Sequence, residues 1–151
     1  MTAQSERMTK RAMTVPEREA FLAEPLVAIL AVQAGPGRAP LAVPMWYGYE
    51  PGGDLTLITA SASRKASLLR AAGRAALVVQ HANPPSKYVY VEGPVVEIRE
   101  PATSDDRRTL ARRYLGPDGG DEYVRTSEDV TASMAVVRIR PERWLSEIQS
   151  R

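Results

Sequence analysis

The chain has 151 residues, with 20 Lys and Arg against 18 Asp and Glu, a single histidine and no cysteine. This length suits one ordinary globular domain and is too short for a large two-domain enzyme. Without cysteine, disulfide scaffolds, Cys-ligated zinc, iron–sulfur clusters and thiol nucleophiles are excluded. With one histidine, His81, a His-rich metal site would need residues from a partner chain, so redox chemistry on this chain requires a bound organic cofactor.

Charge and hydropathy argue against two classes of partner. The net charge is +2 and aromatic residues make up 6% of the chain, which is not typical of a general nucleic-acid binder. The longest wholly apolar run, residues 26–32, is far below the ~20 residues of a membrane span. The polar residues 1–14 are not directly followed by an apolar stretch of the signal-peptide type. We expect a cytoplasmic protein that binds neither nucleic acid nor membranes.

Three helices are predicted along the chain, in a domain over residues 14–151 that follows a loose tail over residues 1–13. Thr14 as capping residue, Pro16 in the first turn and Glu17 near the helix dipole mark the start of the first helix, which ends before Pro25. The second covers residues 63–72 and stops at a glycine. The third covers residues 103–115, stops at Gly-Pro and leads into a polar loop.

Six segments have the pattern of β-strands: residues 26–33, 40–49, 55–59, 74–80, 87–98 and 134–140. Pro44 marks its strand as an edge strand, a bulge or an interrupted ladder. Residues 51–54, Pro-Gly-Gly-Asp, predict a hairpin turn, and the last strand is followed by a short tail around Trp144. Strands joined mainly by hairpins favour a mainly β fold, an antiparallel barrel with short connecting helices.

The most informative segment, residues 58–69, joins a strand to a helix. It places the hydroxyls of Thr59, Ser61 and Ser63 beside two cations, Arg64 and Lys65. Free amides at a helix N-terminus together with hydroxyls form an anion site. The helix dipole disfavours each cation there by ~0.3–1 kcal/mol, and a bound phosphate would reverse that sign. On the residue chemistry alone, the alternative is equally open that both cations are solvated and Ser63 is only a helix cap.

The ordered set of these elements resembles a known superfamily. The strand over residues 40–47, the Gly-Gly-Asp hairpin, the Leu-Thr-Leu-Ile-Thr strand, the Ser-Arg-Lys turn and the Arg-Ala-Ala-Leu-Val-Val strand are similar to the pyridoxamine 5'-phosphate oxidase-like, flavin- and deazaflavin-binding split barrels. The resemblance covers residues 17–140. It implies a six-stranded antiparallel split β-barrel that forms a homodimer, with two flavin-type cofactors bound at the subunit interface.

The resemblance also implies a set of site residues. The cofactor phosphate is expected on Arg64 and Lys65, and the cofactor ring against the strand over residues 43–46. No catalytic residue and no metal ligand is implied. The expected cofactor-binding residues are Val43, Pro44, Met45, Trp46, Thr59, Ser61, Ser63, Arg64, Lys65 and Tyr88.

Departures from the family narrow the expected activity. The tail over residues 143–147 lacks the Arg-rich segment of true pyridoxamine-phosphate oxidases, which argues against vitamin B6 oxidation. Residues 44–47, Pro-Met-Trp-Tyr, instead look like the branch that includes actinobacterial F420-dependent reductases. We therefore expect hydride transfer from coenzyme F420 to an activated double bond of a small organic molecule. The alternatives are an FMN-dependent reductase or oxidase, and a non-catalytic flavin or haem binder.

Several side chains allow two interpretations. Trp46 and Tyr47 either line the cofactor pocket or are one core and one surface residue of a strand. Tyr88 shares a strand face with Tyr90, and the pair is expected to pack across a dimer seam. His81 is interpreted as a loop residue. The charged residues of the third helix form a solvated face or approach an acidic cofactor tail: Asp105, Asp106, Arg107, Arg108, Arg112 and Arg113.

Overall fold

The structure, a computed structural model, describes residues 7–151 and is built on antiparallel strands. Six strands lie side by side in the order β1-β8-β6-β5-β2-β3, while β4 pairs with β7, which pairs in turn with β6. The mainly β antiparallel fold is confirmed. The strand bounds are β1 Thr9–Arg11, β2 Ala28–Val32, β3 Leu41–Met45, β4 Leu55–Ala60, β5 Arg74–His81, β6 Ser86–Arg99, β7 Met134–Ile139 and β8 Arg143–Ser150.

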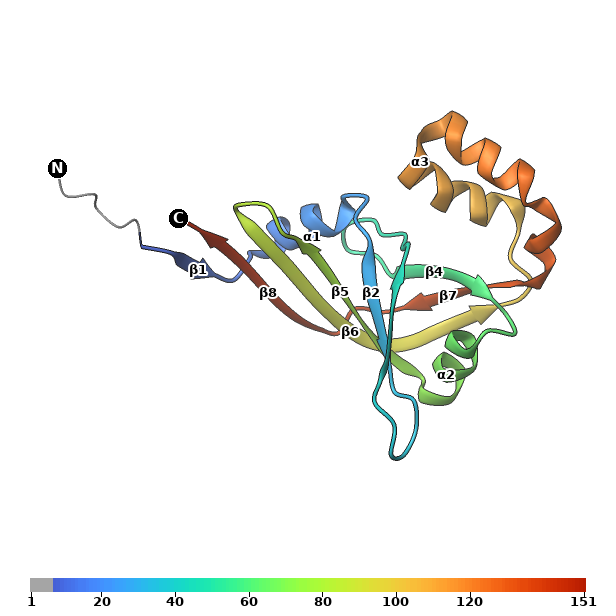
Figure 1. The fold of residues 1–151 in the computed structure, drawn as a ribbon, viewed down its shortest axis with the longest axis horizontal. Helices are drawn as coiled ribbons and strands as arrows, with labels where there is room; N and C mark the ends of the chain where they lie inside the picture. The colour runs from blue at the N-terminus through green and yellow to red at the C-terminus, as the bar shows by residue number, and fades with distance from the viewer. Residues whose placement is uncertain (1–6) are drawn as a thin grey trace.

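The long strand β6 connects the two halves of the split barrel (Figure 1). Its residues from Ser86 to Glu92 pair with β8, and those from Val95 to Arg99 pair with β7 across a bulge. The change of partner occurs at Gly93, where a Cβ would lie 1.7 Å from the carbonyl oxygen of Arg140. Only glycine allows the chain between β7 and β8 to cross β6 this closely.

The hydrophobic core fills the space between the two halves. Alternate residues of the strands point inward, as the two-residue period of a strand requires. Leu30 of β2, Leu57 of β4, Leu77 of β5, Val91 of β6 and Val137 of β7 are all fully buried. Because these residues come from both halves of the barrel, the core fixes β4 and β7 relative to the larger group of strands.

The first two helices form as the sequence predicts. Helix α1 (Val15–Ala23) begins with a capping box in which the Thr14 hydroxyl accepts from the Glu17 amide and the Glu17 carboxylate accepts from the Thr14 amide. Helix α2 (Arg64–Ala72) is capped by the Ser63 hydroxyl and ends at Gly73, which has φ +67°. Both predictions depend on interactions within four residues, and both are confirmed.

The third helix differs from its prediction. Helix α3 covers Ser104–Thr126 and is followed by the 3-10 helix η1 (Glu128–Ser133). Gly116, with φ 78° and ψ 172°, interrupts α3 where the sequence predicts its end. The predicted polar loop is wrong, because Pro117 has the fixed φ of a first helical turn and starts a second helical segment. In Figure 1, α3 lies above β4 and β7 while α2 lies below them.

Two strands lie outside the six predicted ones. Thr9–Arg11, inside the predicted tail, forms β1, and the predicted tail around Trp144 forms β8. β8 pairs with backbone groups of β6 that no other strand uses, and β1 pairs in turn with the outer edge of β8. Residues 1–6 of the predicted tail lie outside the described residues.

The predicted hairpin forms its turn, but the strands on either side of it, β3 and β4, do not pair with each other. The turn itself forms, with the Gly53 amide donating to the Glu50 carbonyl over 2.8 Å. However, β3 and β4 belong to different halves of the barrel, and Gly48–Thr56 is the bridge that the turn closes. β3 is a sheet edge, which fits the proline at position 44.

Candidate functional site

A cavity of about 340 Å³ opens where β3, β4 and α3 meet, and we call it the Lys65 cavity. It unites residues that are far apart in the sequence. Six of the ten residues expected from the sequence line it: Pro44, Met45, Trp46, Thr59, Ser63 and Lys65. The remaining lining comes from β4, α3 and β7: Ile58, Ala60, Arg107, Leu110, Ala111, Tyr123 and Met134.

One wall of the Lys65 cavity is the junction between β4 and α2. Thr59 is buried at the end of β4, and its hydroxyl lies 3.4 Å from the Ser63 hydroxyl. Ser63 accepts from the Ala66 amide at 3.2 Å and so caps α2. Lys65 extends from the first turn of α2 into the lining. Two hydroxyl residues and a lysine at the start of a helix therefore line one cavity, and such groups suit an anion.

Another part of the lining is aromatic and is formed by Trp46, directly after β3, and Tyr123 of α3. Trp46 stacks on Tyr114 with ring centroids 4.8 Å apart, and Tyr123 lies 5.6 Å from Trp46 at an angle of 50°. Of the two interpretations of Trp46, the structure favours the pocket over the core, since the indole lines the Lys65 cavity and is half-buried. The position of the Trp46 indole depends on α3, because the indole stacks on Tyr114 of that helix.

Arg107 of α3 also lines the Lys65 cavity and is buried, with 4% of its surface exposed. Its guanidinium donates to the Ser127 carbonyl at 2.9 Å, the Ser127 hydroxyl at 2.7 Å and the Thr131 hydroxyl at 2.8 Å. The interpretation of the α3 charges as one solvated face is wrong for this residue. The cavity lining contains two cations and, among residues 7–151, no carboxylate.

Four of the expected site residues lie elsewhere. Val43 is half-buried, pairs with buried Leu30 and packs against the core, whereas the next residues of the chain, Pro44 and Met45, line the cavity. Arg64 is exposed, since one helical residue turns the side chain by about 100° from Lys65. Ser61 is held by its backbone, with its carbonyl accepting from Arg70. Tyr88 is half-buried in mid-sheet on β6 and lines none of the cavities.

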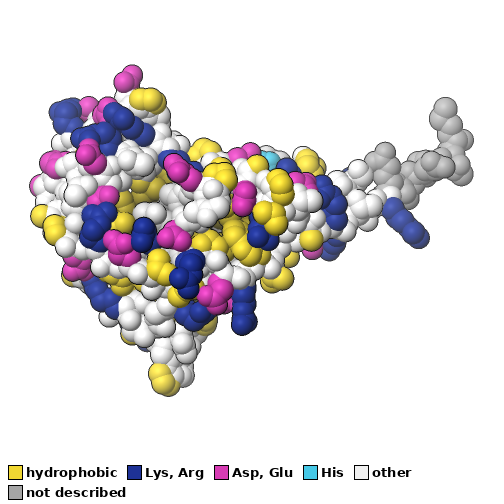
Figure 2. Space-filling model, turned by 180° about the vertical axis from the view of Figure 1, so that it is seen from behind, with side chains coloured by type: hydrophobic (Ala, Val, Ile, Leu, Met, Phe, Trp, Pro, Cys, Tyr) yellow, Lys and Arg dark blue, Asp and Glu magenta, His cyan; other side chains and the backbone are white. Residues whose placement is uncertain are grey.

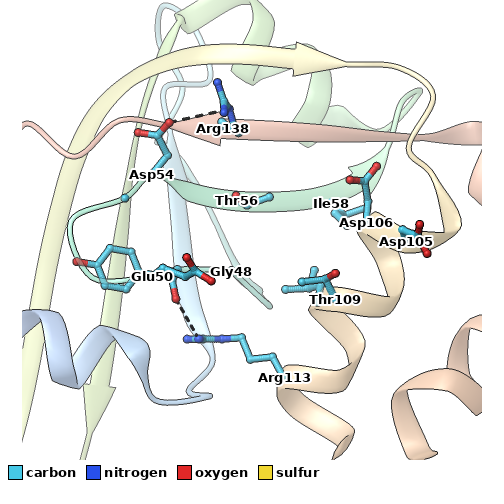
Figure 3. Close-up of a pocket in the computed structure, with 13 residues that line it drawn as sticks. Gly48, Glu50, Asp54, Thr56, Ile58, Asp105, Asp106, Thr109, Arg113 and Arg138 are labelled. Carbon is cyan, nitrogen blue, oxygen red and sulfur yellow. Dashed lines mark hydrogen bonds and ion pairs between the residues drawn. The ribbon is translucent and has the colours of Figure 1, made fainter. Parts of the chain in front are cut away.

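A second cavity of about 600 Å³ lies between β4, the 48–54 loop and the first half of α3, and we call it the Asp54 cavity (Figure 3). Ile58 and Leu110 line both cavities, so the two are adjacent. Its charged lining residues are Glu50, Asp54, Asp105, Asp106, Arg113 and Arg138. The larger cavity is therefore rich in carboxylates, the opposite of the Lys65 cavity.

Arg113, at the edge of the Asp54 cavity, fastens α3 to α1. Its guanidinium donates to the carbonyls of Leu22 at 2.8 Å, Ala23 at 3.0 Å and Glu24 at 2.8 Å. These carbonyls end α1 and have no partner within the helix. The same guanidinium lies 4.8 Å from the centre of the Tyr47 ring. A cation at the negative end of the α1 dipole therefore sets the position of α3.

Tyr47 is fully buried beside this contact, and its hydroxyl donates to the Leu22 carbonyl at 2.7 Å. Burial raises the pKa of the Tyr47 phenol well above its ordinary value. The phenol stays protonated and its proton is donated to the Leu22 carbonyl, so the role of Tyr47 is structural. Tyr88, which the resemblance implies as a cofactor-binding residue, lies outside the Lys65 cavity.

The sequence contained one signal for the missed residues of α3. Arg107, Leu110, Ala111 and Tyr114 are spaced i, i+3, i+4 and i+7, the stripe that faces inward on a helix. The many charges around this stripe obscured it. Tyr123 carries no such signal, because it lies in the second helical segment beyond Gly116.

A sequence model of the pyridoxamine 5'-phosphate oxidase family matches residues 14–145. The chain belongs to this family. This match confirms the resemblance to the superfamily that the order of the strands and the Ser-Arg-Lys turn indicated. No curated protein sequence matches the chain.

Solved structures share the fold. An F420 reductase superposes with a TM-score of 0.66 at 23% identity, over 83% of this chain and 94% of that one. A conserved hypothetical protein from Mycobacterium tuberculosis gives 0.70 at 26%, over 96% and 89%. An FAD-binding protein from Mesorhizobium loti gives 0.62 at 21%, over 96% and 100%. These likenesses establish the split-barrel architecture of this family member.

The helices, the metal-ligating residue types and the surface charges of the protein show whether it has the features of a membrane span or a metal site. In residues 7–151, no helix is long and apolar enough to cross a bilayer. No group of three or more His, Cys, Asp or Glu side chains in the same residues is arranged to hold a metal ion. Figure 2 shows positive and negative side chains interspersed on one face, with hydrophobic side chains gathered near its middle. The cytoplasmic location stays a prediction.

Proposed function

We propose that the protein is an oxidoreductase that binds coenzyme F420 in the Lys65 cavity and reduces an activated double bond of a small organic molecule. The observation that carries the proposal is the cavity's charge: Lys65 and Arg107 line it, and no carboxylate of residues 7–151 does. The cavity also contains the Ser63 hydroxyl at the start of α2. These groups fit the phosphate of a flavin-type cofactor.

The remaining lining fits the ring of such a cofactor. Trp46, Met45, Leu110 and Ala111 give an apolar surface beside the polar end, as in small-molecule sites generally. When bound, the deazaflavin supplies the hydride. The chain contributes binding at Lys65, orientation against the end of β3, and exclusion of water by α3.

Dimerisation belongs to the same proposal and is supported by a row of apolar residues across the sheet. Pro44 of β3 pairs with Ile29 of β2, Ile29 with Val78 of β5, Val78 with Tyr90 of β6, and Tyr90 with Leu145 of β8. Directly paired residues point to the same side of a sheet. Ile29 is 40% exposed and Leu145 62%. We propose that a second copy of the chain covers this row, which starts at the cavity residue Pro44.

FMN is the alternative cofactor, for use in a reductase or oxidase with the same site. The phosphate of FMN matches the same cations, and the FAD-binding neighbour supports a flavin as well as the F420 reductase supports a deazaflavin. A non-catalytic flavin or haem binder is the remaining alternative. It predicts tight ligand binding without reduction of any acceptor.

A titration of the protein, produced in a host that lacks F420, tests these alternatives. The F420 proposal predicts colourless protein that binds added F420 more tightly than FMN and oxidises reduced F420 when an acceptor with an activated double bond is present. Yellow protein that retains FMN would favour the alternative cofactor. Binding of haem alone, or of neither flavin nor deazaflavin, would overturn the proposal.

A further inference from the structure

Unlike Arg99, Arg108 and Arg112, Arg107 has no acidic partner among the described residues. Arg113 makes no ion pair within residues 7–151 either, but its guanidinium is bound to the carbonyls at the end of α1. Arg99 pairs with Asp106 at 2.8 Å, Arg112 with Asp121 at 2.7 Å, and Arg108 with Asp105. Arg107 makes no ion pair within residues 7–151, and its three hydrogen bonds all go to neutral oxygens of Ser127 and Thr131. It is nevertheless more deeply buried than these three, with 4% of its surface exposed.

A buried cation without an anion is costly, because water no longer stabilises its charge. Arginine cannot avoid this cost by losing its proton. Hydrogen bonds to neutral oxygens offset the cost in part, and an anion offsets it further. The structure therefore leaves an unbalanced positive charge in the wall of a cavity.

The guanidinium also keeps donors free for a ligand. Two hydrogens on Nη1 are taken by the Ser127 carbonyl and the Thr131 hydroxyl, and one on Nη2 by the Ser127 hydroxyl. Nε–H and the second hydrogen of Nη2 make no hydrogen bond within residues 7–151. An arginine that presents two donors binds two oxygens of one phosphate in a fixed geometry.

Arg107 shares its cavity with Lys65, which comes from a different element. Lys65 lies in the first turn of α2 and Arg107 in the first turns of α3. Ser63 lines the same cavity, and no carboxylate of the described residues competes with a bound anion there. The carboxylates of α3 near this site, Asp105 and Asp106, line the Asp54 cavity instead.

We propose that Arg107 is a ligand-binding residue that contacts a phosphate of an organic ligand in the Lys65 cavity, so that the anion is held by cations of both α2 and α3. This deepens the proposed function and rests on its placement of the ligand in this cavity. It does not require that the ligand be a flavin. A phosphorylated ligand then ties α3 to the barrel across the cavity, and α3 becomes more ordered when the ligand binds.

The test compares FMN with riboflavin, which has the same ring and no phosphate. Arg107→Met is measured beside Arg108→Met, which removes the same charge from the adjacent residue of the helix but outside the Lys65 cavity. We expect Arg107→Met to weaken FMN binding about tenfold or more and to leave riboflavin binding within about twofold. Arg108→Met should leave both affinities unchanged. FMN, but not riboflavin, should slow amide hydrogen exchange in α3 of the unsubstituted protein.

Equal weakening of FMN and riboflavin by Arg107→Met would overturn the inference, because it would mean that Arg107 only shapes the cavity. If Arg107→Met does not fold, Arg107→Gln, which can still bond Ser127 and Thr131, takes its place in the same comparison. If the protein binds neither flavin, thermal stabilisation by pyrophosphate decides the matter. Stabilisation of the protein and of Arg108→Met but not of the Arg107 variant would support the inference while the flavin proposal fails. Equal stabilisation of all three, or of none, would overturn it.

Discussion

The Trp46 indole stacks on the Tyr114 ring with centroids 4.8 Å apart and planes 5° from parallel. The Tyr114 hydroxyl meanwhile accepts from the Tyr47 amide at 3.0 Å and donates to the Leu26 carbonyl at 2.8 Å. One residue of α3 therefore satisfies two backbone groups of the barrel and also positions a cavity side chain. The aromatic wall of the Lys65 cavity is part of how α3 docks, which couples stability to ligand binding.

Tyr114→Phe separates the two roles of this residue. The ring stack survives, but the Tyr47 amide and the Leu26 carbonyl lose their partner, and we expect a loss of about 1–3 kcal/mol in the free energy of unfolding. Urea denaturation measures it. Tyr123→Phe is the matched control, because the Tyr123 hydroxyl makes no hydrogen bond within residues 7–151. Equal stability of the two variants would show that the Tyr114 hydroxyl does not anchor α3.

Arg113→Met should destabilise the protein more strongly. It removes three hydrogen bonds to the carbonyls of Leu22, Ala23 and Glu24 at the end of α1. The Ala23 carbonyl loses its donor, while Leu22 keeps the Tyr47 hydroxyl and Glu24 keeps the Leu26 amide. Hydrogen bonds from a charged donor to such groups contribute about 1.5–3 kcal/mol, so we expect a loss of at least 2 kcal/mol in urea denaturation. Arg112→Met removes an exposed pair with Asp121 and should cost under about 1 kcal/mol. A loss for Arg113→Met as small as this would contradict the assigned role.

The neighbouring cations of α2 should contribute unequally to ligand binding. Lys65 lines the Lys65 cavity whereas Arg64 is exposed and does not. We expect Lys65→Ala to weaken the binding of F420 or FMN about tenfold or more, as loss of a charge-assisted contact does, and Arg64→Ala to weaken it less than threefold. Fluorescence titration of both variants compares them directly. A larger effect of Arg64→Ala would place the phosphate outside this cavity.

Leu145→Asp tests the proposed dimer. Leu145 is 62% exposed at the end of the apolar row, and a carboxylate there would be buried by a partner chain without a counter-charge. We expect a dimer for the unsubstituted protein and a monomer for Leu145→Asp by light scattering. Val15→Asp, at an exposed position in the first turn of α1, should remain dimeric. A monomeric unsubstituted protein that still binds cofactor would refute a site completed by dimerisation.

Local signals in the sequence predicted the local structure well. The cap of α1 at Thr14 and the cap of α2 at Ser63 depend on side chains that reach amides three residues away. Such contacts involve residues close together in the sequence, so they can be predicted without knowledge of the fold. Pro44, which lacks an amide proton, predicted an edge strand, a bulge or an interrupted ladder, and the first of these is found.

Long-range pairing accounts for what the sequence did not reveal. Strand β8 contains Arg143, Ser146 and Glu147 and lacks the apolar alternation of a strand, yet it forms because β6 presents a long unpaired edge. The position of Arg107 in the Lys65 cavity could not be predicted either, because it also depends on contacts between residues far apart in the sequence. Its burial depends on Ser127 and Thr131, twenty or more residues along the chain, and no short motif reports that contact.

The ion pair between Arg99 and Asp106 at the start of α3 predicts how the stability of the protein changes in acid. Hydrogen bonds from the Arg99 guanidinium, foremost, lower the pKa of Asp106 to about 2 from its ordinary 3.8. Because the pKa is lower in the folded chain, the pair stabilises the fold fully above about pH 4, and this contribution disappears as the pH falls through 2. Solvent screening of the partly exposed Arg99 limits the contribution to roughly 1 kcal/mol.

Asp106→Asn should remove this contribution and with it part of the pH dependence. The Asn oxygen can still accept from the Thr103 amide, so the cap of α3 is kept while the charge is lost. We expect the variant to be less stable than the unsubstituted protein at pH 7 by roughly 1 kcal/mol, and the difference to shrink towards pH 2 and to disappear below it, in urea denaturation at a series of pH values. Glu17, whose pKa Arg11 also lowers to about 2, titrates in both proteins and cancels in the difference. Asp105→Asn, which changes an exposed pair with Arg108, is the control. A stability difference between Asp106→Asn and the unsubstituted protein that persists unchanged at pH 2 would mean that Asp106 acts through packing and not through its charge.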